Sequence, residues 1–347
     1  MSLINPLNKL MKFAYSFLNI LFTRTVALIL ILFSLFSLPI EAKPIAYLDG
    51  NAADISPPMA GFAYNLGGGG PDIDAAIQWT INQVRGCKTC SQKVDVVIIR
   101  HSGGAGYNQA ILDMDGVDSV ETLVISQRED ADDKNIVDKI QNAEVVFVAG
   151  GDQCQYLRKY TKTGVESAIK SVVERGGSVG GTSAGAMIQS DFVFNACSES
   201  VTSETALMNP YQDVDLNPGM FHWQYLEETI IDTHFYERDR MGRLMTFVAR
   251  LLADGITESV MGIGIDEGTS LIVNKTGLAT VVGNGYVYFV LGDHLPEKCE
   301  PQTPLTFTDF KIWKKGDGET FDLKNRPSIS DYQVSVKDGR LMSSSFY

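Results

Sequence analysis

Short β-branched runs alternate with helical periodicities along most of the chain. Four runs without a polar face predict buried strands, and they cover residues 94–100, 121–125, 144–149 and 178–181. Between the last two runs, apolar residues from Val165 to Val173 follow helical spacing and end at two glycines, 176–177. This alternation predicts an α/β fold in which crossover helices join parallel strands.

The pattern begins before this region and loosens after it. An apolar run over 62–66, four glycines and a helical pattern over 73–84 predict a first strand, turn and helix. A later helix covers 244–252 and closes at Gly255. Short runs from 260 to 290, separated by Asn and Gly turn residues, predict hairpins at a sheet edge.

The N-terminus predicts a secretory signal. Lys9, Lys12 and Arg24 precede an uncharged run of 13 residues, 26–38, and Ala42 is a plausible cleavage point. The run is short for a membrane span, although an uncleaved anchor remains the alternative. We therefore predict a signal peptide over 1–42, a secreted or periplasmic α/β domain over 43–300, and a β-rich C-terminal extension, 301–347, packed on the same domain.

Charge limits the choice of partners. The chain has 42 Asp and Glu against 29 Lys and Arg, a formal charge of −13, and loss of 1–42 would change it to −15. Such a protein repels nucleic acid and anionic membrane surfaces, so an acidic substrate would need a local basic cluster. The five cysteines are too few for a disulfide scaffold, and Cys87 and Cys90 predict a small surface disulfide, with unpaired thiols as the alternative.

The strongest chemical signal is a G-x-S-x-G turn around Ser183. It lies between a predicted strand and a predicted helix, as a nucleophile elbow does, and the N–H of Ala184 could stabilise an oxyanion. A second glycine turn, Gly150 and Gly151, ends the preceding strand and could supply the other oxyanion donor. Each pattern also fits an ordinary glycine turn, and the first also fits a phosphate loop.

A serine nucleophile needs a base, and His234 is the strongest of the four histidines. Arg238, Arg240 and Arg243 follow it within ten residues, and Asp232 lies on its side of an extended segment. The alternative is a solvated, charged helix start. For the acid that holds the imidazole, Glu267 is the first choice and Asp266 the second, because both end an apolar strand.

In this order, the motifs GGDQ, GGTSAGA, D-x-HFxxRxRxGR and GIGIDE resemble those of cyanophycinases and related S51 serine peptidases, which include aspartyl dipeptidases. The resemblance covers about residues 60–290. It implies a flavodoxin-like parallel sheet akin to class I glutamine amidotransferases, with a Ser183–His234–Glu267 triad in which serine replaces their cysteine. It implies no metal or organic cofactor, and a homodimer is possible.

The resemblance also implies a substrate pocket. Its lining residues would be Gln153, Asp232, Arg238, Arg240 and Arg243. Cyanophycinases have glutamine before the catalytic histidine, at a position that contacts substrate, whereas this chain has Thr233. The segment 101–108 departs from the family form as well.

The implied function is a secreted exopeptidase that hydrolyses cyanophycin, multi-L-arginyl-poly-L-aspartate, to β-Asp-Arg dipeptides through an acyl-enzyme. Because Thr233 and the segment 101–108 differ from the family pattern, the alternative is a dipeptidase or isopeptidase that acts on short Asp or isoaspartyl peptides. A third reading, from a different class, is a catalytically silent protein that binds acidic peptides.

Overall fold

The computed structural model describes residues 10–15, 17–18, 22, 44–343 and 345–347. The chain divides into two units, Met1–Lys43 and Pro44–Tyr347. In the first unit the described residues are helical and exposed, and the predicted signal run and cleavage point lie outside the described residues. Within the described ranges, none of the helices has the length and apolar content needed to cross a membrane.

The first sheet of the larger unit has a flavodoxin-like centre. Five parallel strands lie in the order β4-β3-β5-β6-β2, and antiparallel β1 and β11 flank them. Four of these strands, β3 to β6, have the doubly wound arrangement 2-1-3-4, and β2, which precedes them along the chain, occupies the fifth position. The nine strands in spatial order are β1 (Ile45–Gly50), β4 (Val117–Val124), β3 (Val94–Arg100), β5 (Val145–Val148), β6 (Ser178–Thr182), β2 (Tyr64–Gly67), β11 (Thr269–Val273), β12 (Leu278–Gly283) and β15 (Thr320–Asp322).

Helices cover both faces of this sheet, which explains its doubly apolar strands. Val96 and Ile98 of β3 pack with α2 (Asp74–Arg85) and α3 (Asn108–Leu112) in one cluster. Val97 and Ile99 belong to the main core. That core also contains residues of α4 (Lys134–Asn142), α5 (Gln153–Tyr160) and α6 (Gly164–Glu174), and a short 3-10 helix, η1 (Glu129–Asp132), precedes α4. The predicted α/β, flavodoxin-like class is confirmed.

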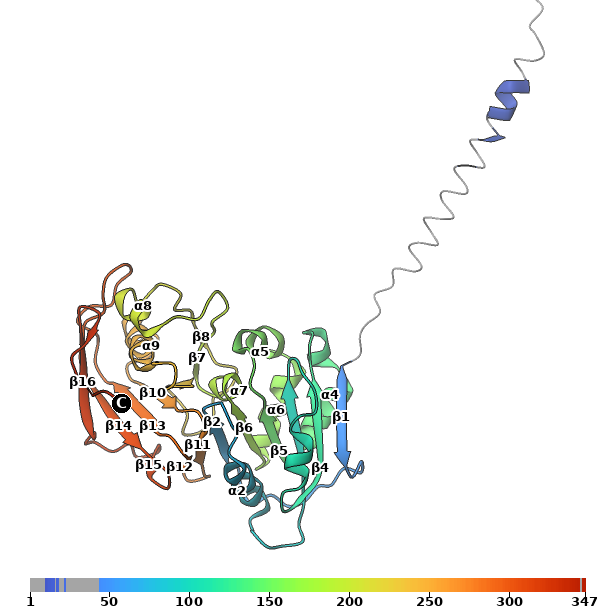
Figure 1. Ribbon diagram of the computed structural model, residues 1–347. Coiled ribbons are helices and arrows are strands. Elements are labelled where there is room, and N and C mark those ends of the chain that lie inside the picture. Colours follow the sequence, from blue (N-terminus) through green and yellow to red (C-terminus); the bar gives the residue numbers. More distant parts are fainter. Residues whose placement is uncertain (1–9, 16, 19–21, 23–43, 344) are drawn as a thin grey trace, which may run out of the picture. The chain divides into compact units, whose positions relative to one another are not determined.

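A second sheet of eight strands, which the sequence did not predict, lies beside the first (Figure 1). Its spatial order is β17 (Arg340–Leu341), β16 (Tyr332–Lys337), β14 (Phe307–Lys315), β13 (Val287–Gly292), β10 (Val260–Ile265), β9 (Thr229–Thr233), β7 (Phe192–Phe194) and β8 (Leu216–Pro218). The helices α8 (Ser203–Met208) and α9 (Met241–Ala253) pack against each other, and α9 packs on β10. Residues 301–347 thus supply strands to both sheets.

The hairpin prediction over 260–290 was right in one place and wrong in another. β11 and β12 form an antiparallel hairpin. However, β10 and β13 pair with each other inside the second sheet, so the chain changes sheets after β10 and again after β12. Both turns contain glycine with a positive φ, Gly268 at +59° and Gly283 at +134°, where other side chains would be strained.

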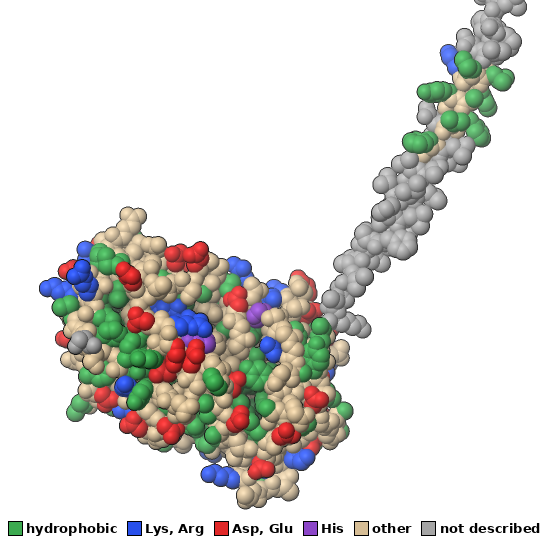
Figure 2. All heavy atoms as spheres, viewed as in Figure 1, with side chains coloured by type: hydrophobic (Ala, Val, Ile, Leu, Met, Phe, Trp, Pro, Cys, Tyr) green, Lys and Arg blue, Asp and Glu red, His purple; other side chains and the backbone are tan. Residues whose placement is uncertain are grey.

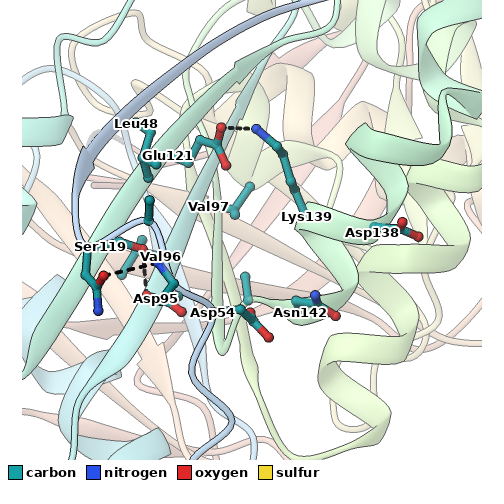
Figure 3. Close-up of a pocket in the computed structure, with 14 residues that line it drawn as sticks. Leu48, Asp54, Asp95, Val96, Val97, Ser119, Glu121, Asp138, Lys139 and Asn142 are labelled. Atoms are coloured by element: carbon teal, nitrogen blue, oxygen red, sulfur yellow. Dashed lines mark hydrogen bonds and ion pairs between the residues drawn. The ribbon is translucent and has the colours of Figure 1, made fainter.

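One cavity, of about 230 Å³, lies between β1, β4 and α4 (Figure 3). Four of its polar side chains form two pairs: Ser119 donates to Asp95 at 2.6 Å, and Lys139 forms an ion pair with Glu121. These internal partners favour a structural role for this cavity.

Candidate active site

Ser183 occupies a tight turn between β6 and α7 (Ala184–Met187). Its backbone has φ +52° and ψ −123°, and its N–H donates to the carbonyl of Gly67 at 2.9 Å. The flanking glycines permit this turn: a Cβ on Gly185 would lie 2.0 Å from the carbonyl oxygen of Val148. The G-x-S-x-G spacing therefore reflects close contact between β5, β6 and α7, and it leaves Ser183 partly exposed.

His234 follows β9 and reaches Ser183 from the second sheet. Its Nε2 lies 2.8 Å from the Ser183 Oγ. His234 also has a positive φ, +50°, and its N–H donates to the carbonyl of Gly68 at 2.7 Å. Neighbouring carbonyls of the Gly67–Gly70 turn thus hold the backbones of both residues.

Glu267, not Asp266, contacts the imidazole. The Glu267 Oε1 lies 2.5 Å from the His234 Nδ1. The buried carboxylate of Asp266 accepts backbone N–H groups from Tyr236 at 3.0 Å and Tyr286 at 2.8 Å, so it stabilises the turn. The first choice from sequence is therefore the one in position to orient His234.

The surroundings favour a neutral imidazole. Burial lowers the pKa of His234 below its usual value, the hydrogen bond to Glu267 opposes this shift, and the positive charges of Arg238 and Arg240 add to it. A neutral imidazole is the form that can accept the serine proton. Figure 2 shows histidine, Lys or Arg, and acidic side chains gathered near the middle of one face.

The two glycines of the second predicted oxyanion turn have different neighbours. A Cβ built on Gly150 would lie 3.5 Å from the Ser183 Cβ, whereas one on Gly151 would meet the His101 ring at 2.8 Å. The N–H of Asp152 donates to the His101 Nε2 at 3.2 Å. The N–H groups of Gly150, Gly151 and Ala184 have no hydrogen-bond partner among the described residues.

Most of the predicted substrate residues are engaged within the protein. Arg243 donates to the fully buried Asp232 at 2.5 and 2.7 Å, and Arg240 donates to it at 3.3 Å. Thr233 is buried too, and its Oγ1 has no hydrogen-bond partner among the described residues. Direct substrate contacts by Asp232, Thr233 and Arg243 stay predictions, because these side chains face one another or the core.

Arg238 and Gln153 are more accessible. Arg238 is exposed, and within the described chain its guanidinium has no ion pair. Gln153 begins α5, and its Nε2 donates to the carbonyl of Phe194 at 3.3 Å. The next residue, Cys154, forms a disulfide with Cys197, and Cys87 is bonded to Cys90.

Sequence reasoning missed the role of the four glycines, 67–70. A Cβ on Gly69 would lie 2.4 Å from the His234 Cε1, and one on Gly70 would lie 3.0 Å from the Glu267 Cβ. The turn therefore packs directly on the base and the acid. The glycine run after a predicted strand is visible in the sequence. The residues that it contacts, His234 and Glu267, lie more than 160 positions later in the chain, so the contact could not be predicted.

Three comparisons place this geometry among known proteins. Residues 108–281 match the model of peptidase family S51. A cyanophycinase from Nostoc sp. is 31% identical over 217 residues, which cover 61% of this chain and 67% of the relative. A cyanophycinase from Geminocystis herdmanii is 26% identical over 220 residues, covering 62% and 75%.

A solved structure supports the fold. A peptidase from an acI-B1 Actinobacterium aligns with a TM-score of 0.53 at 20% identity, covering 76% of this chain and 98% of that one. The sequence matches establish that the chain belongs to peptidase family S51 and is a peptidase by family.

Proposed function

We propose that this protein is a secreted serine-type exopeptidase of the cyanophycinase type, which hydrolyses cyanophycin to β-Asp-Arg dipeptides. The continuous chain of contacts from Ser183 through His234 to Glu267 carries the proposal, because it joins a nucleophile, a base and an orienting acid. The similarity to cyanophycinases supports the choice of substrate.

The proposed reaction has two halves. His234 Nε2 takes the proton of Ser183 as the oxygen attacks the α-carbonyl carbon of an aspartate in the polymer backbone, and Glu267 stabilises the charged imidazole through Nδ1. His234 then gives the proton to the leaving amine, which leaves an acyl-enzyme. Water, deprotonated by the same histidine, releases the acid and restores Ser183.

Backbone N–H groups are the proposed oxyanion donors. Ala184 follows the nucleophile directly, and Gly150 lies beside Ser183, with Gly151 as the alternative donor. A donor of this kind contributes roughly 3 kcal/mol to the stabilisation of the transition state.

Arg238 is the proposed anchor for the free carboxylate at each branch of the polymer. Its exposed guanidinium can form two parallel hydrogen bonds to a carboxylate. Asp232 would act indirectly by holding Arg240 and Arg243 in place. Gln153 and Thr233 would complete the pocket, as in the family resemblance.

Export belongs to the proposal as well, whereas the homodimer stays a prediction from the family resemblance. The basic residues before the apolar run 26–38 support export. The two disulfides are the kind of bond that persists in oxidising compartments.

Cleavage of short Asp or isoaspartyl peptides is the second candidate. The segment 101–108 departs from the family form, and its His101 packs on Gly151 and accepts the N–H of Asp152. The departure thus lies beside the proposed oxyanion turn, where it can change substrate choice.

The test compares the protein with Ser183→Ala on insoluble cyanophycin and on short β-Asp and α-Asp peptides, with products identified by mass spectrometry. Release of β-Asp-Arg from polymer by the unaltered protein alone supports a cyanophycinase. Cleavage of short peptides alone supports the second candidate. If neither substrate is cleaved and a serine-reactive phosphonate fails to label the folded protein, the chain is a silent binder of acidic peptides.

A further inference from the structure

A cavity of about 550 Å³ adjoins the triad on the side of Glu267. This volume lies within the range of roughly 300–1,000 Å³ that is typical of ligand sites. Tyr236 and Glu237, which line it, follow His234 by two and three residues. Glu237 Oε2 also accepts the backbone N–H of Glu267 at 3.0 Å, so this wall of the cavity is continuous with the site.

The other walls are largely aromatic. Tyr286, Tyr288 and Tyr347 line the cavity, and the Tyr347 ring meets Tyr236 and Tyr288 edge to face at centroid distances of 5.2 and 5.6 Å. Contacts of this kind give the walls a fixed shape.

Lys314 brings a positive charge to the wall of the cavity. Its Nζ lies 3.8 Å from the ring centroid of Tyr286 and 5.6 Å from that of Tyr288. Aromatic faces attract cations at such distances. Across the described part of the chain, no carboxylate forms an ion pair with this ammonium, so it can receive an anionic group.

The cavity also has one accessible carboxylate. Asp266 is 3% exposed and already accepts two backbone N–H groups. Glu237 is exposed, and only its Oε2 is engaged. The lining thus presents a cation from Lys314 and a carboxylate oxygen from Glu237 between aromatic surfaces.

We propose that this cavity is a second substrate subsite, which binds the arginine branch next to the β-Asp-Arg unit being released. The α-carboxylate of the arginine pairs with Lys314, and its guanidinium pairs with Glu237 and stacks on a tyrosine ring. The inference rests on the proposed function and makes it more specific. One β-Asp-Arg unit cannot occupy the active site and this cavity at the same time. The subsite therefore favours polymer over dipeptide.

Binding tests the cavity without catalysis. L-arginine is titrated by calorimetry into Ser183→Ala and into the same protein with Lys314→Met or Lys315→Met. Lys315 is the matched control, because its ammonium pairs with Asp331 at 2.8 Å. We expect Lys314→Met to weaken binding at least tenfold and Lys315→Met to leave it unchanged, and agmatine, which lacks the carboxylate, to bind at least tenfold more weakly than L-arginine.

Equal effects of the two lysine substitutions, or agmatine binding as tightly as L-arginine, would overturn the proposal. Thermal unfolding of each variant establishes that it is folded.

Kinetics test the role in substrate choice. The measured quantity is kcat/KM for a substrate with two arginine branches divided by kcat/KM for a substrate with one branch. In the protein with Ser183 intact, we expect Lys314→Met to lower this ratio about tenfold. An unchanged ratio overturns the subsite. Arginine binding that depends on Lys314, in a protein that cleaves neither substrate, would instead overturn the proposed function and retain the cavity as an arginine site.

Discussion

Ser183 and His234 share a costly backbone conformation. Each has a φ near +50°, which costs roughly 1–3 kcal/mol for a residue other than glycine. Carbonyls of Gly67 and Gly68 accept their N–H groups and so hold both residues in place. The glycine turn therefore positions two catalytic candidates at once.

Gly69→Ala tests this turn. Its φ is +94°, and the added methyl would lie 2.4 Å from the His234 ring, so we expect His234 to move and kcat to fall about 100-fold. Gly255→Ala is the control, because its φ is also positive, +68°, and nothing lies within 4 Å of its Cβ position. Steady-state kinetics of both variants, together with their melting temperatures, separate displacement of His234 from general unfolding. Equal activity in the two variants would remove the positioning role.

The charge state of His234 predicts a pH profile. Because burial holds the pKa of His234 below 6.5, kcat/KM should rise with pH, with a midpoint below 6.5, as the imidazole loses its proton. Arg238→Met removes a positive charge that lowers this pKa, so the midpoint should move upward. A midpoint that falls in the variant contradicts this account of the site.

Among the elements, α5 and β7 are joined beside the site. Cys154 of α5 is bonded to Cys197, three residues after β7, and Gln153 donates to the carbonyl of Phe194. Both links start at the first two residues of α5, directly after the Gly150–Asp152 turn, and reach the end of β7 or the segment that follows it, so they restrain the proposed oxyanion donors.

Removal of this disulfide should affect stability and rate together. The bond closes a loop with a sequence separation of 43, and we expect Cys154→Ser with Cys197→Ser to cost about 2–4 kcal/mol of unfolding free energy. We also expect kcat to fall more than KM rises. The pair Cys87→Ser and Cys90→Ser, with a separation of three, should change neither kcat nor KM. Denaturant unfolding and kinetics measure these effects, and an unchanged kcat in the first pair would assign that bond to stability alone.

The strands also show which parts of the fold could be predicted from the sequence. Strands such as β3 and β5 were predictable, because burial on both faces makes them apolar throughout. Burial also hid the second sheet: every residue of β9 and β10 is buried, and a buried run does not reveal its partners. The triad was predictable from motifs, whereas the pairing of Asp232 with Arg243 and the packing of Gly69 on His234 depend on contacts made only in the folded chain.

Across the whole molecule, both sheets lie within residues 44–347 and contribute to one core. Buried residues from β5 of the first sheet and β10 of the second belong to the same cluster. The described contacts that build the site are also internal to this unit.

A chain of residues 44–347 should therefore fold by itself. We expect its melting temperature to lie within about 2 °C of that of the full chain, since a difference in stability of 1 kcal/mol shifts the midpoint by only a few degrees. Phosphonate labelling of Ser183 should proceed at the same rate in both. A shorter chain that unfolds or fails to label would show that residues 1–43 contribute to the site.

The changes of sheet after β10 and β12 have a practical consequence. Ser183 ends a strand of the first sheet, His234 ends a strand of the second, and Glu267 lies in the turn where the chain passes between them. A cut in the exposed segment 198–200 would put the nucleophile on one fragment and its base and acid on the other. Neither fragment could hydrolyse an amide alone, so recovered turnover after mixing would report fragment complementation.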